Sequence, residues 1–222
     1  MSKANIIYFD SRGKAEAIRL MLAAAGIEWE EEHLNSKERV EEIRKDGRLI
    51  FEQFPLLEID GVKISQSMAA VRYLADKHDL MGKTLLENVR INMLADGARD
   101  WLALGGFTGL MFQPAEKREA VKAASLNKSR TRYLPAFDKA LKENGSNGYL
   151  VGDKLTMADL LFLDVLTWVW EFDEDLVTQF PAAKDFLNKV RSLPNIKSYL
   201  EGPQRHGQPD EEYAKMVNHI LY

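Results

Sequence analysis

The sequence predicts a small α/β domain over residues 1–82, followed by an all-helical domain over residues 83–222. Strand-like runs and turn signals are confined to the first region, where Asp60-Gly61 separates two apolar alternations and gives the strongest short-range hairpin signal. In the second region apolar residues recur at helical spacing, and no strand pattern stands out. A sheet covered by helices, followed by a helical bundle, is the simplest assembly of these elements.

The composition excludes several kinds of partner and site. The chain has 222 residues and a formal net charge of −4, which argues against nucleic acid or an anionic membrane surface as the main partner. No stretch approaches the ~18 apolar residues that would span a bilayer. No cysteine is present, so disulfides, thiolate metal sites and a protein-borne thiol nucleophile are excluded. The four histidines show no ligand spacing, so we expect no metal. The first apolar run is too short for a signal peptide, and we expect a cytoplasmic location.

The elements of the first region follow from apolar periodicity and turn residues. Those expected before the hairpin are a strand over 4–9, a helix over 14–25, a strand over 27–34 parallel to the first, and a partly helical segment over 36–48. A helix over 68–77 and a linker over 78–84 follow the hairpin. The resulting order, βαβ-α-ββα, is typical of a thioredoxin-like domain.

The helix after the hairpin begins at a polar pair, Gln66-Ser67. Serine is a favoured N-cap residue, so Ser67 is predicted to cap this helix. The start of a helix carries unpaired N–H groups and the positive end of its dipole, which together favour a bound carboxylate or phosphate. This point is therefore a candidate anion-binding site.

The second region contains helical patterns of unequal length. They cover 86–112, 115–143, 156–172 and 182–192, with shorter ones at 195–200 and 209–221. Pro135 is predicted to kink or break its helix, because it lacks a backbone donor and clashes one turn back. Thr156 and Asp159 form a capping box, and the apolar run 160–170 that follows is predicted to be the buried central helix.

Several segments, in order along the whole chain, match one known family. Taken together the chain resembles a cytosolic glutathione transferase, most closely the alpha class, with sigma-like features. The matching segments are Tyr8–Glu16, Leu22–Ile27, Asp46–Pro55, Glu58–Gly61, Gln66-Ser67, Arg132–Phe137 and Tyr149–Asp159. The resemblance implies glutathione as co-substrate and a homodimeric assembly.

The resemblance assigns the thiol chemistry to Tyr8 and Lys14. Taken alone, a tyrosine at the end of a strand is more often a packed residue than a catalyst. By resemblance, the Tyr8 hydroxyl donates a hydrogen bond to the glutathione sulfur, and Lys14 stands where the alpha class has an arginine. A thiol titrates near ~8.5, and lowering its pKa by about two units takes roughly 2.7 kcal/mol of preferential stabilisation of the anion. Arg12, by resemblance, pairs with a carboxylate and fixes the helix start.

The resemblance also implies the residues that hold glutathione. Phe54, which precedes a Pro55 implied to be cis, presents its backbone to the cysteinyl residue of glutathione. Gln66 and Ser67 hold the γ-glutamyl end. The remaining contacts implied are from Arg44, Gln53, Asp100 and Arg132, with Asp100 supplied by the partner subunit. From the residues alone, the charged members of this set would be ordinary surface charges.

The last element, 209–221, carries apolar residues on one helical face. It is either a tail docked on the core or, by resemblance to the alpha class, a lid over an apolar site. The residues expected to line that site are Phe9, Phe107, Leu110, Met216, Ile220 and Tyr222. Phe51 resembles the alpha-class aromatic residue that enters the neighbouring subunit of a homodimer.

The function expected from this resemblance is conjugation of the glutathione thiolate to an apolar electrophile. The alternatives are glutathione-dependent prostaglandin isomerisation, a non-catalytic carrier of hydrophobic ligands, and a lens-type structural relative. The sequence does not name the second substrate, because one apolar contact changes selectivity by only ~1–3 kcal/mol.

Overall fold

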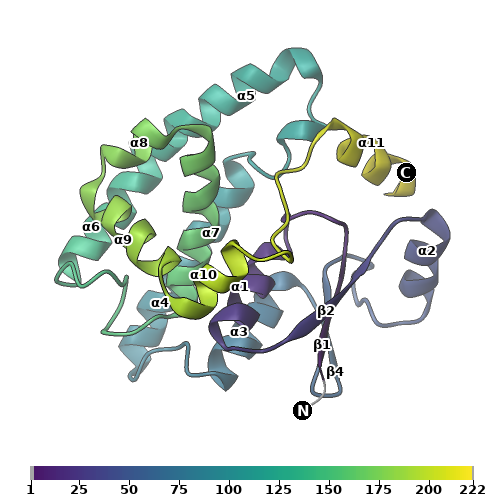
Figure 1. Cartoon of the computed structure of the whole chain (residues 1–222), viewed down its shortest axis with the longest axis horizontal. Coiled ribbons are helices and arrows are strands. Elements are labelled where there is room, and N and C mark those ends of the chain that lie inside the picture. Colours follow the sequence, from purple (N-terminus) through teal and green to yellow (C-terminus); the bar gives the residue numbers. More distant parts are fainter. Residues whose placement is uncertain (1–2, 222) are drawn as a thin grey trace.

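A four-stranded mixed sheet forms the core of the N-terminal part of the protein (Figure 1). The computed structural model describes residues 3–221. The strands are β1 (Ala4–Tyr8), β2 (Trp29–His33), β3 (Leu56–Ile59) and β4 (Val62–Ser65), in the spatial order β2-β1-β3-β4. β1 pairs parallel with β2 and antiparallel with β3, and β3 and β4 form the predicted hairpin. Asp60 and Gly61 have φ values of 54° and 78°, as a tight hairpin turn with two left-handed residues requires.

Three helices accompany this sheet, and their order confirms the predicted βαβ-α-ββα arrangement. They are α1 (Glu16–Ala24), α2 (Lys37–Lys45) and α3 (Ser67–Lys77). Figure 1 shows α1 and α3 on the side of the sheet that faces the helical part of the molecule, with α2 on the other side. α1 and α3 contact each other and also α7 (Met157–Phe172), so two apolar helices connect the sheet to the second domain.

The second domain is helical throughout the described residues, as the sequence predicts. Its remaining elements are α4 (Leu85–Leu104), the 3₁₀ turn η1 (Leu110–Phe112), α5 (Ala115–Lys128), the π-helical turn η2 (Ser129–Tyr133), α6 (Leu134–Glu143), α8 (Glu174–Thr178), α9 (Pro181–Arg191), α10 (Pro194–Leu200) and α11 (Glu211–Leu221). α7 is buried from Met157 to Val169, which confirms it as the central helix. The capping box of Thr156 and Asp159 is formed, with both reciprocal hydrogen bonds present.

The helical domain differs from the expectation in one helix boundary and one additional short helix, and the break predicted at Pro135 is present. The helix predicted over 86–112 ends at Leu104, because Gly106 takes a left-handed φ of 72° and turns the chain. Pro135 stands at the start of α6, directly after a π-helical turn, so the predicted break is present in that form. The short helix α8 was not predicted, since its five residues are too few to show a period.

One buried side chain connects the two domains. The Arg12 guanidinium, 1% exposed, donates to both carboxylate oxygens of Glu171 on α7, at 3.1 and 2.6 Å. It also lies over the Trp168 ring, 4.1 Å from the centroid. Arg12 therefore pairs with a carboxylate as expected, and its partner belongs to the other domain.

Candidate active site

A cavity of about 460 Å³ lies where the loop after β1 meets η1 and α11. One wall comes from the thioredoxin-like domain and the other from the helical domain. The lining residues are Tyr8, Phe9, Ser11, Gly13, Lys14, Arg44, Glu52, Gln53, Phe54, Thr108, Gly109, Phe112, Tyr213, Val217 and Leu221. The first wall is mostly polar and the second mostly apolar, which suits a ligand with one charged and one hydrophobic end.

Tyr8 is the last residue of β1, and the loop that follows β1 holds its side chain in place. The Lys14 backbone N–H donates to the Tyr8 hydroxyl oxygen at 3.1 Å. Gly13 brings the loop this close: it has a φ of 41°, and a Cβ on it would lie 2.5 Å from the hydroxyl oxygen. Only glycine fits there, so the loop sequence fixes the position of the phenol.

The electrostatics of this position keep Tyr8 neutral. Burial raises its pKa, and the Lys14 N–H together with the Arg19 and Arg99 charges opposes that rise only in part. The hydroxyl already accepts from Lys14, and its own proton is left to donate into the cavity. A neutral phenol with a free donor is suited to stabilise an anion such as a thiolate.

The Lys14 side chain is exposed at the rim of the cavity. It contributes its backbone to Tyr8 and its charge to the cavity entrance. An exposed ammonium is well solvated, so its electrostatic effect on a bound anion is small.

Three of the predicted glutathione-binding residues line the polar wall: Arg44, Gln53 and Phe54. The Arg44 Nε donates to the Glu52 carbonyl at 3.3 Å, and the Gln66 amide donates to the Gln53 side-chain oxygen at 3.1 Å. The Phe54–Pro55 bond is cis, as the resemblance implies.

The start of α3 corrects one prediction. Ser67 is the first helical residue, and the N-cap is Gln66, with a φ of 73° and no side-chain capping hydrogen bond. Ser67 is buried, and its hydroxyl accepts from the Arg99 guanidinium at 3.3 Å. Since no side chain caps the helix, its first N–H groups remain open to a ligand carboxylate. The anion site is therefore more open than a serine cap would allow.

The two charged residues predicted from the helical domain do not line the cavity of this chain, and Asp100 was expected to serve the cavity of the partner subunit. Asp100 on α4 and Arg132 in η2 are exposed, and neither lines the cavity. Arg99, one position before Asp100, instead faces Ser67. Sequence reasoning missed it, because neighbouring positions on a helix point about 100° apart and only the docking of α4 decides which one faces the site.

The residues expected to contact an apolar ligand only partly match those that line the cavity. Phe9 lines the cavity, with its ring 6.3 Å from that of Phe54. Phe107 and Leu110 are buried beneath the wall, where Phe107 stacks on Phe172 with centroids 5.7 Å apart. Their neighbours that do line the cavity are Thr108, Gly109 and Phe112.

On α11, the cavity is lined by Tyr213, Val217 and Leu221 rather than by Met216 and Ile220. These residues belong to adjoining stripes of one amphipathic helix, offset by one position. Tyr222, also expected here, lies outside the described residues. α11 contacts η1 in the helical domain and α2 in the sheet domain, so it covers one side of the cavity.

A thioredoxin-like domain followed by a helical domain, with a cavity where they meet, is the fold of glutathione transferases. The comparisons agree: the glutathione S-transferase N-terminal domain model matches residues 4–76, and the C-terminal domain model matches residues 102–203. Glutathione S-transferase A1 of Mus musculus is 45% identical over 89% of this chain and 88% of its own. Glutathione S-transferase alpha-2 of Rattus norvegicus is 44% identical over 96% of each chain.

Solved structures lead to the same family. The crystal structure of Na-GST-3, a monomeric glutathione S-transferase from Necator americanus, has a TM-score of 0.79 and 30% identity, and the match covers 90% of this chain and 97% of that one. The chain belongs to the glutathione S-transferase family. Among residues 3–221, no helix has the length and apolarity needed to cross a membrane.

Proposed function

We propose that the cavity binds glutathione on its polar wall and conjugates the sulfur to an electrophile held on its apolar wall. The observation that carries this proposal is the Tyr8 hydroxyl. The Lys14 backbone N–H donates to this hydroxyl at 3.1 Å, and Tyr8 lines a cavity that has one polar and one apolar wall. The family supports this reaction, since the curated relatives are glutathione S-transferases.

The chemistry needs a thiolate, which Tyr8 stabilises by donating its proton in a hydrogen bond to the sulfur. The thiol proton leaves to water. The sulfur lone pair then forms a bond to the electrophilic carbon, and the leaving group departs with the electrons of the bond that breaks. Catalysis comes from a lowered thiol pKa and from holding both reactants in contact.

The polar wall would hold the tripeptide along its length. In this proposal Arg44 and Gln53 bind the glycyl end, and the Phe54 backbone before Pro55 binds the cysteinyl residue. The open start of α3 receives the glutamyl carboxylate, with Gln66 and Ser67 beside it. We also propose that Asp100 and Arg132 contact the glutamyl end of glutathione. Asp100 is exposed on α4 and would contact the glutathione bound to the partner subunit.

The experiment measures the turnover of a chloronitrobenzene with glutathione by the wild type and Tyr8→Phe. Removing one donor to a developing or bound anion costs about 10²-fold in rate, so we expect kcat/KM to fall by about that factor. A prostaglandin isomerase or a ligand carrier would show negligible conjugation in the wild type. An inactive wild type, or an unchanged Tyr8→Phe variant, would overturn the proposal.

We also propose that the protein is a homodimer. The N-terminal half of α4 exposes an apolar face: Leu85, Leu86, Val89 and Met93 are 78%, 80%, 48% and 70% exposed. Phe51, predicted as the intersubunit anchor, is 63% exposed. Contiguous exposed apolar groups of this kind mark a protein interface. Sedimentation equilibrium of the wild type and Met93→Glu is the test: a dimer that the substitution dissociates is expected, and a monomeric wild type contradicts it.

The domain boundary after residue 82 and the cytoplasmic location stay predictions. Limited proteolysis between α3 and α4 would test the first, and fractionation of cells that express the protein would test the second.

A further inference from the structure

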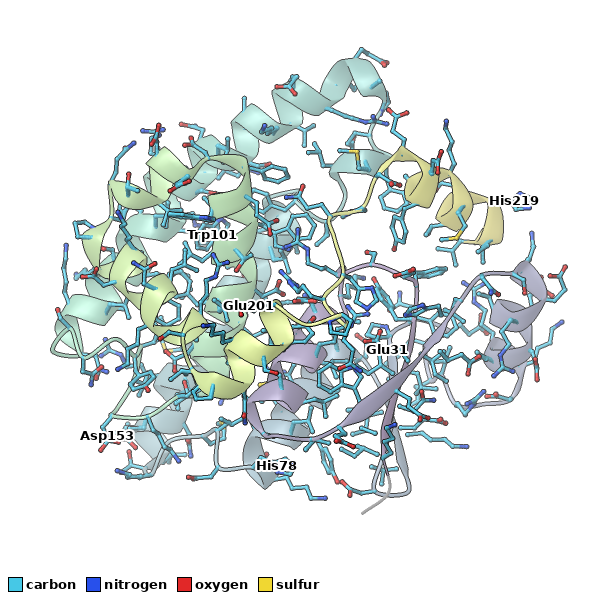
Figure 2. The ribbon with its side chains drawn as sticks, in the orientation of Figure 1. Glu31, His78, Trp101, Asp153, Glu201 and His219 are labelled. Atoms are coloured by element: carbon cyan, nitrogen blue, oxygen red, sulfur yellow. The ribbon has the colours of Figure 1, made fainter. Side chains whose placement is uncertain are left out.

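Three side chains from distant parts of the chain meet beside the segment that leads to α11. Asp10 follows β1, His33 ends β2, and His206 lies between α10 and α11. One nitrogen or oxygen atom from each lies within 4.8 Å of the other two. The sheet brings the first two together, because Tyr8 and His33 are register partners in the parallel pair β1–β2. Figure 2 labels Glu31, the neighbour of this cluster on β2, close to the chain that runs toward α11.

The two imidazoles present the same nitrogen to Asp10. The Nδ1 atom of His206 is 2.8 Å from one carboxylate oxygen of Asp10, and the Nδ1 atom of His33 is 3.9 Å from the other. Ligands in a tetrahedral zinc site lie ~2.0–2.2 Å from the ion, so they lie about 3.3–3.5 Å from one another. The observed distances lie on either side of this value, and small rotations of the side chains would close the site.

A second carboxylate lies on the far side of both rings. The Nε2 atoms of His206 and His33 are 3.3 and 3.6 Å from the same oxygen of Glu31. Glu31 is itself held by Arg19, which donates from Nε and Nη2 at 2.9 and 2.7 Å. A carboxylate on one imidazole nitrogen, with the other nitrogen aimed at a common point, is the arrangement that supports histidine ligands in metal sites.

From this geometry we propose that Asp10, His33 and His206 bind a Zn²⁺ ion, with water completing the coordination. Two imidazoles and one carboxylate suit zinc and its transition-metal neighbours, whereas Mg²⁺ and Ca²⁺ prefer oxygen ligands alone. Access is available, since the Asp10 side chain is 66% exposed and that of His33 is 39% exposed. Ordinary ion pairing between these groups would give the same contacts without a metal, and the experiment must separate the two.

A bound ion would join three segments around the cavity. Asp10 lies two residues after Tyr8, and His206 precedes α11, which supplies Tyr213 and Val217 to the apolar wall. The ion would therefore fix the base of α11 to the loop that carries the catalytic tyrosine. This site was not expected from the sequence, because its ligands are 23 and 173 residues apart and show no motif spacing.

The test titrates the full chain, first stripped of metal by a chelator, with ZnCl₂ in a calorimeter. We expect one Zn²⁺ per chain and a higher Tm with zinc present. Asp10→Asn, His33→Asn and His206→Asn should each weaken binding by at least about 10-fold, the lower end of the loss seen for supporting residues. The matched control is His219→Asn, on the exposed outer end of α11, which should bind zinc as the wild type does (Figure 2).

Circular dichroism without zinc checks that each variant folds. If His206→Asn does not fold, Asp10→Asn and His33→Asn decide the question, because both residues have exposed side chains. Failure of the wild type to bind zinc would overturn the proposal. So would binding by the three ligand variants within about 2-fold of the wild type, or an equal loss in His219→Asn.

Discussion

The two walls of the cavity are built in different ways. The polar wall consists of short segments attached directly to the sheet: Tyr8 ends β1, and Gln53-Phe54 lies just before β3. The start of α3 adjoins this wall, because the Gln66 amide donates to the Gln53 side chain. The apolar wall consists of η1 and α11, which belong to the helical domain and lie against the sheet domain only by docking. Positions of the first kind are set by local backbone rules, whereas positions of the second kind depend on how separate elements pack.

The difference also predicts how each wall responds to substitution. Changes in the polar wall should alter specific hydrogen bonds to one ligand and give large, well-defined effects. Changes in the apolar wall should alter contact area and give smaller effects that depend on the co-substrate. The pairing of Arg12 with Glu171 on α7 connects the two domains that carry these walls.

The largest effect is expected from Arg12→Met, which removes this connection. Arg12 is buried, and its loss leaves Glu171, whose side chain is 34% exposed, with the neutral Gln208 amide at 2.7 Å in place of a cationic partner. Breaking a buried pair costs about 3–5 kcal/mol, and the partial exposure of Glu171 favours the lower end. Urea unfolding measures the change in the free energy of unfolding.

The matched control for this substitution is Arg39→Met. Arg39 and Glu32 form a comparable pair at 2.5 Å, and each side chain is about one third exposed, at 34% and 33%. An exposed pair contributes at most about 1 kcal/mol. Equal losses in the two variants would show that Arg12 adds nothing to the junction of the domains.

A smaller effect is expected from Ser67→Ala, at the start of α3 next to the polar wall. A hydrogen bond to a charged group is worth about 1.5–3 kcal/mol, so the KM for glutathione should rise by about 10- to 100-fold. The KM for the electrophile should stay constant, because the apolar wall is untouched. Steady-state kinetics with each substrate varied in turn measures both. Ser65→Ala, on the half-buried end of β4, is the control. A parallel rise in both KM values would contradict the division of the cavity into two walls.

Next in size is Val217→Ala on the apolar wall. Val217 lines the cavity and Met216 does not. Removing two methyl groups should cost about 1 kcal/mol, or about 5-fold in kcat/KM for an apolar electrophile, without change in the KM for glutathione. Met216→Ala removes more apolar volume and should have the weaker effect. A larger loss in Met216→Ala than in Val217→Ala would show that Met216 lines the cavity, as the sequence predicts.

The elements of the polar wall were predictable because each has a local signal. Asp60-Gly61 specifies the hairpin turn, and its φ values show why. The family resemblance then placed Tyr8 and the cis Phe54–Pro55 bond on that frame. Even here the cap of α3 was wrong: polar type alone does not tell whether Gln66 or Ser67 occupies the N-cap, and Gln66 does so at a positive φ.

The apolar wall was less predictable because periodicity defines a face without saying what that face meets. The stripe on α11 was found, but docking against η1 decides which neighbouring stripe lines the cavity. Phe107 was misplaced for a related reason, since the left-handed Gly106 ends α4 early and turns the ring into the core. Arg99 was missed because nothing local distinguishes it from Asp100.

The smallest effect is expected from Lys14→Gln, which separates the side chain of Lys14 from its backbone. The backbone N–H that holds Tyr8 remains in this variant, and only an exposed charge is lost. An exposed charge stabilises a bound anion by less than about 1 kcal/mol. Its loss should therefore raise the thiol pKa by less than about 0.7 and lower the thiolate fraction by at most about 5-fold. Losing a cation raises the thiol pKa, so the loss should appear at neutral and lower pH and disappear where the thiol is fully ionised. The pH dependence of kcat/KM for the electrophile, measured at saturating glutathione, reports this shift.

The contrasting variant is Gly13→Ala, because a Cβ at this position would lie 2.5 Å from the Tyr8 hydroxyl oxygen and displace the phenol itself. If Lys14→Gln were as damaging as Gly13→Ala, the lysine charge and not the tyrosine position would control the thiolate.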